Sequence, residues 1–269
     1  MARKLTNEEI KSHELEMLRE LDSVAKENGL NLYLCGGTLL GAIRHKGFIP
    51  WDDDVDVCLP RPDYNRLVRL NREKKLFSDH LKLVCPEDGT FMFPFMKLVD
   101  IRTTTKKMYG NDIPHLWVDI FPVDGLPDDR KKANKVLKKV SFLRRLLYIR
   151  NAEWGEGRTL FHKLSKLVLI PLSRIITQKK YVSAITGTAK QCPYGSTKHC
   201  GIVTMGLYGP GERISYEGFR KPTEVSFEGE TYRTYSNWDE YLSGIYGDYM
   251  QLPPEEKRKT HDMEVTIKE

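Results

Sequence analysis

Hydrophobic positions change between helical and strand spacing through the first 126 residues of the chain. Apolar residues recur at helical intervals over residues 10–25, and Thr6 and Glu9 precede them at the spacing of a capping box. Over residues 30–35, leucines alternate with other side chains, which predicts a half-buried strand. Because the two spacings mix, we expect an α/β or α+β fold.

A glycine pair ends that strand. Gly36-Gly37 is followed by helical spacing in "TLLGAIR", so the pair marks a strand-to-helix turn. After the loop "HKGFIPW", residues 54–59 alternate again, with valine and leucine on one face and Asp54 and Asp56 on the other. Pro62 suits the first turn of the next helix.

Further patterns predict strands at residues 81–85, 94–100 and 116–121. A hairpin is expected around Glu228-Gly229. A helix should begin near Ser236, where Asp239 has capping-box spacing.

Two amphipathic helices are predicted in the middle of the chain. One apolar stripe runs from Val136 to Leu147, and a second runs from Leu160 to Val168, where Pro171 is expected to interrupt it.

The composition is that of a globular protein. The chain has 269 residues, of which 40% are hydrophobic, and its longest aliphatic run, residues 167–172, is far shorter than the roughly 20 residues that span a bilayer. Its five cysteines include no C-x-x-C pair, which indicates neither a disulfide framework nor a zinc ribbon. We therefore expect a cytoplasmic protein.

Positive and negative charges are unevenly distributed along the chain. Residues 130–180 contain fifteen Lys and Arg but only two Glu, a local charge of +13, whereas the rest carries −7. This basic region has too few aromatic residues at stacking spacing, and no recognised motif, to favour nucleic acid. Two compatible interpretations stay open: a packed bundle with a solvated charged face, or a surface that contacts anionic lipid at the inner face of the membrane.

Four aspartates in "WDDDVDV" indicate a site. Asp52 and Asp53 are equally consistent with a solvated turn, but Asp54 and Asp56, two positions apart on one strand face, bring carboxylates within about 7 Å. A divalent cation is the simplest compensation for their repulsion. An EF-hand is excluded because Val57 stands where glycine is required, and a P-loop is excluded because its Gly-Lys-Ser/Thr ending is absent.

A strand, a Gly-Gly turn at a helix start and a second strand with Asp-x-Asp together form the layout of a nucleotidyltransferase. The turn can hold a phosphate while the carboxylates hold Mg²⁺. Such sites usually take a third carboxylate from a neighbouring strand. Asp119 in "LWVDIF" is the candidate, with Asp124 in reserve.

Three stretches resemble the LicD family of phosphocholine transferases: "YLCGGTLLGAIRHKGFIPWDDDVDVCLPRPDY", "WVDIFPVDGLP" and "YLSGIYGDYMQLPPEEKRKTHD". The resemblance implies an α+β nucleotidyltransferase-like mixed sheet with helical additions. It also implies transfer of a phosphorylated alcohol from a CDP-activated donor to a glycan hydroxyl. In bacterial members this is phosphocholine from CDP-choline onto teichoic acid or lipopolysaccharide sugars. Other members transfer ribitol phosphate, so the donor stays open.

The resemblance implies roles for individual residues. Asp54 and Asp56 match the metal-binding pair for Mg²⁺ or Mn²⁺, and Gly36, Gly37 and Thr38 match the phosphate turn. Strand context and a similar motif place Asp119 as a third ligand or as a base. Residues 1–126 would form the catalytic core, 127–195 a basic helical region, and 196–269 the part that completes the catalytic domain.

Further candidates lie near these motifs. Arg44 and Lys97 are expected near the donor diphosphate, although a surface salt bridge explains either equally well. A quaternary ammonium is best held by aromatic faces. The possible walls, each of which also suits a core position, are Trp51, Tyr109, Trp117 and Trp154.

The sequence therefore predicts a metal-dependent phosphocholine transferase whose donor is CDP-choline. Its acceptor would be a cell-envelope glycan carried on a membrane lipid, and no nucleic acid would be bound. The rivals are transfer of another phospho-alcohol or a nucleotidyl group, and a non-catalytic lipid- or nucleic-acid-binding protein. A pure binding module has no need for two crowded carboxylates, which favours catalysis.

Overall fold

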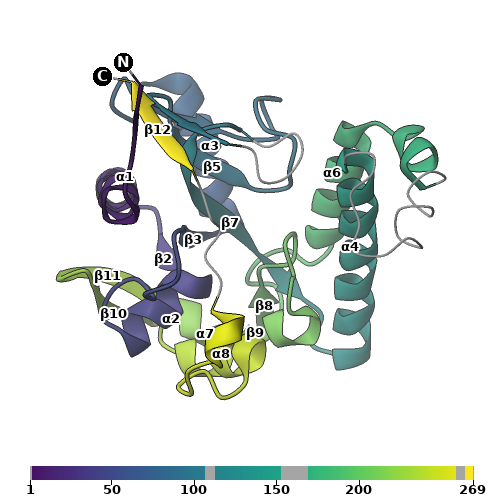
Figure 1. The fold of residues 1–269 in the computed structure, drawn as a ribbon. Helices are drawn as coiled ribbons and strands as arrows, with labels where there is room; N and C mark the ends of the chain where they lie inside the picture. The colour runs from purple at the N-terminus through teal and green to yellow at the C-terminus, as the bar shows by residue number, and fades with distance from the viewer. Residues whose placement is uncertain (1, 107–112, 153–168, 259–263, 269) are drawn as a thin grey trace.

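A mixed sheet of seven strands lies at the centre of the computed structural model, which describes residues 2–106, 113–152, 169–258 and 264–268 (Figure 1). Its main path has the order β2 (Tyr33–Leu34), β3 (Val55–Pro60), β7 (Leu116–Leu126), β5 (Met96–Asp100) and β4 (Leu81–Val84). Strands β8 (His199–Gly201) and β9 (Ile214–Ser215) extend the sheet from the end of β7. Among the described strands of this sheet, β3 and β7 pair in parallel and all other pairs are antiparallel. The predicted α+β fold with a mixed sheet is confirmed.

Helices surround this sheet. In chain order they are α1 (Asn7–Glu27), α2 (Gly36–Arg44), α3 (Arg61–Glu73), α4 (Arg130–Asn151), α6 (Gln178–Ala189), α7 (Glu217–Arg220) and α8 (Trp238–Tyr246), with short 3₁₀ turns η1 (Gly209–Glu212) and η2 (Glu255–Lys257). The capping box is confirmed at the start of α1: the Thr6 hydroxyl accepts from the Glu9 amide, and the Glu9 carboxylate accepts from the Thr6 amide. Within the described residues, none of the helices has both the length and the apolarity to cross a bilayer.

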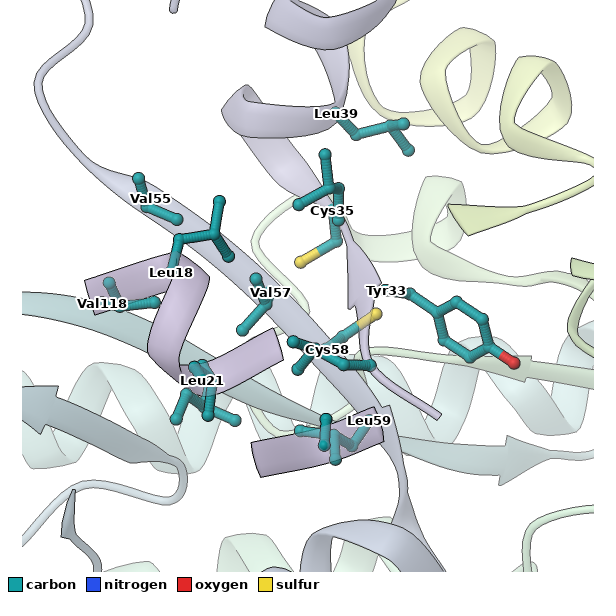
Figure 2. Close-up of a cluster of buried hydrophobic side chains, with 14 of the residues drawn as sticks. Leu18, Leu21, Tyr33, Cys35, Leu39, Val55, Val57, Cys58, Leu59 and Val118 are labelled. Atoms are coloured by element: carbon teal, nitrogen blue, oxygen red, sulfur yellow. The ribbon is translucent and has the colours of Figure 1, made fainter. Parts of the chain in front are cut away.

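The core lies between α1 and the centre of the sheet. Leu18 and Leu21 of α1 pack over the valines of β3 and over Val118 of β7 (Figure 2). The opposite side of β2 is also covered, because the Tyr33 ring contacts the rings of Phe219 and Tyr235. The prediction of a half-buried strand over residues 30–35 is therefore wrong: hydrogen-bonded pairing is limited to Tyr33–Leu34, and both faces are buried.

The C-terminal segments complete the fold. Strands β10 (Pro222–Phe227) and β11 (Glu230–Tyr235) form the predicted hairpin, and its turn residues Glu228 and Gly229 both have positive φ, at 49° and 79°. A small sheet that the sequence did not predict joins β1 (Ala2–Lys4), β12 (Val265–Lys268) and β6 (Thr103–Thr105). This sheet places the two ends of the chain side by side (Figure 1).

Two local predictions are corrected by the structure. Helix α8 begins at Trp238 without a side-chain cap, because Asn237 donates instead to the Ser215 carbonyl and to Glu240, so no capping box forms between Ser236 and Asp239. The stripe from Leu160 to Val168 lies outside the described residues. Pro171 does not interrupt a helix among the described residues, because residues 169–174 are helical.

The basic region contains α4 and α6, which pack against each other at one side of the molecule (Figure 1). Helix α4 agrees with the predicted stripe, whereas α6 was not predicted. Strand β7 runs from the central sheet directly toward α4, so the basic helices are continuous with the strand that carries Asp119.

Candidate active site

Three neighbouring strands place a row of charged residues side by side. Asp119 of β7 is in register with Asp56 of parallel strand β3 and with Lys97 of antiparallel strand β5. Residues in register on adjacent strands point to the same face of a sheet, so the row brings two carboxylates and one ammonium together.

The Asp119 carboxylate is held in a fixed orientation. The Trp117 indole nitrogen Nε1 donates to Asp119 Oδ2 at 3.2 Å, and Lys97 Nζ lies 3.5 Å from Oδ1. The same ammonium lies 3.9 Å from the centre of the Trp117 ring. Because Lys97 is only 3% exposed, this is a buried ion pair and not a surface salt bridge.

The Asp56 side chain is half-buried and lies against the glycine turn. Its own backbone N–H donates to the Thr38 hydroxyl at 2.7 Å, which fixes the start of β3 relative to α2. Burial, together with the charges of Asp119 and Asp52, raises the pKa of the Asp56 carboxyl well above its ordinary value, although the Gly37 amide donates to it. Several negative charges thus converge at one place.

A carboxylate lies so close to each glycine of the turn that a larger side chain would collide with it. Gly36 has φ of +54°, and a methyl group at its Cα would collide with the Asp56 carboxylate. A methyl group at Gly37 would lie 2.5 Å from Asp52 Oδ2. In this structure the turn therefore supports the carboxylates, and the Gly37 amide that the sequence assigned to a phosphate donates to Asp56.

The donor set fits a hard divalent cation. No group of three or more metal-ligating side chains is assembled within the described parts of the chain. Mg²⁺ is commonly held by one or two carboxylates, and substrate phosphates and water complete its coordination. Asp56 and Asp119 supply two such carboxylates, and a cation there would relieve the repulsion that raises the pKa of Asp56.

The charge of Asp54 acts on a buried carboxyl of α1. Asp54 directly precedes β3, and its charge acts on Glu14 of α1, whose carboxyl pKa is raised well above the ordinary value first by burial and then by Asp54, Asp53 and Asp52. Glu14 is completely buried, and neither of its carboxyl oxygens has a hydrogen-bond partner among the described residues. Glu14 was not predicted as part of this cluster, although a carboxylate within the apolar stripe of α1, four residues after Ile10, was a visible signal.

Asp124, the alternative to Asp119 as a third carboxylate, forms a buried ion pair with Arg61. Arg61, the first residue of α3, donates to its two oxygens from Nε at 2.7 Å and from Nη2 at 2.6 Å, and both side chains are buried. This bidentate pair ties α3 to the second half of β7.

Arg44 connects α2 to the C-terminal segment. Its Nη1 donates to the Tyr249 carbonyl at 2.7 Å, and its guanidinium lies 5.9 Å from the centre of the Trp51 ring. The Arg258 guanidinium lies 4.9 Å from the same ring. The structure therefore does not bring Arg44 into the row of Asp56, Asp119 and Lys97. Two of the candidate aromatic walls, Tyr109 and Trp154, lie outside the described residues.

The charges of Asp56 and Asp52 act on an aromatic pair that the sequence did not single out. The Tyr208 and Tyr246 rings meet edge to face with their centres 5.2 Å apart. Burial raises the pKa of both hydroxyls, and the nearby charges of Asp56 and Asp52 contribute to this rise. Tyr246 lies in the family-like "GIYGDY" stretch, whereas nothing in the local sequence marks Tyr208.

Residues 29–148 match the family described as LicD/FKTN/FKRP, nucleotidyltransferase domain. The chain is also 32% identical to lipopolysaccharide cholinephosphotransferase LicD of Haemophilus influenzae, across 97% of this chain and 98% of that protein. The chain belongs to the LicD family. An uncharacterised protein of Rickettsia typhi is 28% identical over 32% of this chain and 29% of its own length. The LicD domain match contains the whole row of Asp56, Asp119 and Lys97 together with the glycine turn.

Proposed function

We propose that this LicD-family protein transfers phosphocholine from CDP-choline to a hydroxyl of a cell-envelope glycan, a teichoic acid or lipopolysaccharide precursor. The observation that carries the proposal is the row of Asp56, Asp119 and Lys97 beside the glycine turn. The name of the Haemophilus influenzae relative, which spans nearly the whole chain, supports phosphocholine as the transferred group and lipopolysaccharide as an acceptor.

In the proposed reaction the acceptor hydroxyl oxygen forms a bond to the phosphorus that carries choline. The bond from that phosphorus to the bridging oxygen of the diphosphate breaks, and CMP leaves with the electron pair. The hydroxyl proton passes to a carboxylate or to water. Asp56 and Asp119 are the residues that would hold Mg²⁺ or Mn²⁺. When bound, such an ion neutralises phosphate charge and lowers the pKa of a coordinated hydroxyl.

In this proposal, neighbouring residues position the two carboxylates of the row. Trp117 and Lys97 keep the Asp119 carboxylate oriented, since one donates a hydrogen bond to it and the other forms an ion pair with it. Thr38 and Gly37 fix Asp56 through its amide and its carboxylate. A preorganised site of this kind does not have to reorient its charged groups when the substrate arrives.

The Tyr208–Tyr246 pair is the aromatic surface best placed for the trimethylammonium group. The charge of Asp56 acts on the Tyr246 hydroxyl, whereas the Trp51 ring already faces two guanidinium groups and the Trp117 ring already faces Lys97. Aromatic faces attract a quaternary ammonium that cannot donate a hydrogen bond.

Product analysis with a set of donors tests this proposal. The protein is incubated with Mg²⁺, a lipopolysaccharide or teichoic acid acceptor, and CDP-choline, CDP-ethanolamine or CDP-ribitol, and both CMP and the modified glycan are measured. We expect CDP-choline to be the preferred donor. Tyr246→Leu should reduce the preference for CDP-choline over CDP-ethanolamine by about tenfold, whereas Tyr246→Phe, which keeps the ring, should retain it. Preference for CDP-ribitol would refute the phosphocholine assignment.

A further inference from the structure

A recess beside α4 contains an arginine that is buried without a hydrogen-bond partner at one of its nitrogens. The recess has a volume of about 390 Å³, within the usual range of ligand pockets, and its walls include Ser141, Arg144, Arg145, Tyr148 and Leu207. Arg144 is only 8% exposed, and its Nη1 atom is fully buried and makes no hydrogen bond to any described residue. One residue that lines the recess therefore also has a buried donor without a partner among the described residues.

The charge of Arg144 is incompletely compensated. Burial lowers the pKa of its guanidinium, and the neighbouring charge of Arg145 acts in the same direction. Tyr148 and Glu212 act in the opposite direction, but within the described residues no carboxylate forms an ion pair with Arg144. A guanidinium that is removed from water without a close counter-ion favours the binding of an anion, and its planar fork suits phosphate oxygens.

The surroundings of the recess combine positive charge with exposed apolar side chains. Helix α4 carries nine Lys and Arg and no acidic residue. The segment that follows the second gap in the described residues is joined to the end of α4, because Arg150 donates to the Ile176 carbonyl and Arg174 donates to the Arg150 carbonyl. The large apolar side chains exposed on α4, on this segment and beside the recess are Phe142, Tyr148, Leu169, Leu172, Ile175, Ile176 and Leu207.

The combination of basic and exposed apolar side chains favours a membrane over nucleic acid or a glycan as the partner. Exposed leucine and isoleucine side chains contribute little to binding nucleic acid or a polar glycan, whereas basic residues together with exposed aliphatic and aromatic residues are typical of surfaces at the membrane interface. We propose that the α4 recess binds the phosphate of an anionic phospholipid headgroup and holds this side of the protein against the membrane. The site is independent of the donor that the carboxylate row uses.

Vesicle co-sedimentation of the full chain tests this site. Binding to phosphatidylcholine vesicles is compared with binding to vesicles that also contain phosphatidylglycerol, at low and at physiological salt. We expect binding only when the anionic lipid is present, with weakening as salt increases. Equal recovery with both types of vesicle, or none with either, would overturn the proposal.

Matched variants separate the recess from general charge attraction. Lys139→Gln removes one exposed charge of α4 outside the recess and should weaken binding by about fivefold or less. Arg144→Gln should weaken it by about 20-fold or more, because a charge-assisted hydrogen bond is also lost. Arg145 lines the recess from an exposed position, so Arg145→Gln carries no risk to folding. This variant should also lose more vesicle binding than Lys139→Gln. Equal losses in all three variants would contradict a specific site.

A soluble phosphate ester is the other possible source of the same chemistry. Calorimetry with glucose 6-phosphate, in the absence of lipid, measures this directly. We expect no binding in the micromolar range. Tight binding that Arg144→Gln abolishes, together with a lack of vesicle binding, would show a soluble phosphate site and overturn the assignment to lipid.

Discussion

At the scale of single residues, Trp117 orients the Asp119 carboxylate through one hydrogen bond from Nε1 and also faces Lys97. Trp117→Phe keeps an aromatic ring beside the ammonium but removes the donor. We expect the transfer rate to fall by about tenfold because Asp119 loses a fixed charge-assisted hydrogen bond worth about 1.5 kcal/mol or more. CMP release measures the effect, and Trp238→Phe on α8 is the control. An unchanged rate in Trp117→Phe would show that the hydrogen bond has no part in the reaction.

A buried carboxyl should make stability depend on pH. Glu212 is 3% exposed, and burial raises the pKa of its carboxyl from the ordinary 4.5 to about 7, against the opposing effects of the Tyr208 amide and Arg144. Between these two pH values the unfolded chain releases a proton that the folded chain retains. The free energy of unfolding should therefore fall as the pH rises from about 4.5 to 7, by about 3 kcal/mol from this group.

Glu212→Gln removes this dependence. Denaturant unfolding of the natural protein and the variant at several pH values gives the difference between them, which should change in favour of the variant as the pH rises. Glu217→Gln, at an exposed position, should show no such trend. A difference that is constant with pH would mean that Glu212 does not retain its proton.

Residue types and spacing identified part of the site because Asp56, Asp119 and the glycine pair lie in short local patterns. The pairing of Asp56 with Asp119 required the strand order, which the sequence does not contain. Lys97 was chosen for its nearness to a motif, and only the register of β5 with β7 shows that it meets Asp119. Tyr208 lies in an irregular segment, and its approach to Asp56 depends entirely on tertiary packing.

At the scale of elements, the start of α2 shows how a turn supports the site. Gly36→Ala and Gly29→Ala both place a side chain at a similar positive φ, +54° and +59°, but only at Gly36 would the new methyl group meet a carboxylate. Each should lose about 1 kcal/mol of stability from backbone strain. Only Gly36→Ala should also lose transfer activity, because Asp56 must move. Equal activities in the two variants would contradict the supporting role of the turn.

Element boundaries were predicted where hydrophobic spacing is regular and missed where tertiary contacts decide. Strand β7 continues to Leu126, beyond the predicted end at residue 121, because β8 pairs with its second half. Strand β2 is shorter than expected because only Tyr33 and Leu34 pair with β3, and α2 begins at Gly36. The β1–β12–β6 sheet joins segments from both ends of the chain, so no local pattern could reveal it.

At the scale of the whole molecule, the last quarter of the chain packs against the elements around the glycine turn. The hairpin and α7 cover Tyr33. The Tyr241 hydroxyl accepts a hydrogen bond from the Gly36 amide, and Arg44 donates one to the Tyr249 carbonyl. A chain that ends at residue 195 should therefore neither show cooperative unfolding nor release CMP. Circular dichroism and the transfer assay check this. A stable, active fragment would show instead that residues 196–269 form an addition to a core that folds without them.

We propose that Asp56 and Asp119 form the catalytic centre, and the rate of CMP release from CDP-choline in the presence of Mg²⁺ and acceptor measures their contribution. We predict that Asp56→Asn and Asp119→Asn each lower the rate by about 100-fold or more, with the fold retained. The exposed Asp79→Asn should be unaffected, and Asp54→Asn shows whether the carboxylate beside Glu14 belongs to the same centre. Near-normal turnover of Asp56→Asn or Asp119→Asn at saturating Mg²⁺ would contradict the account.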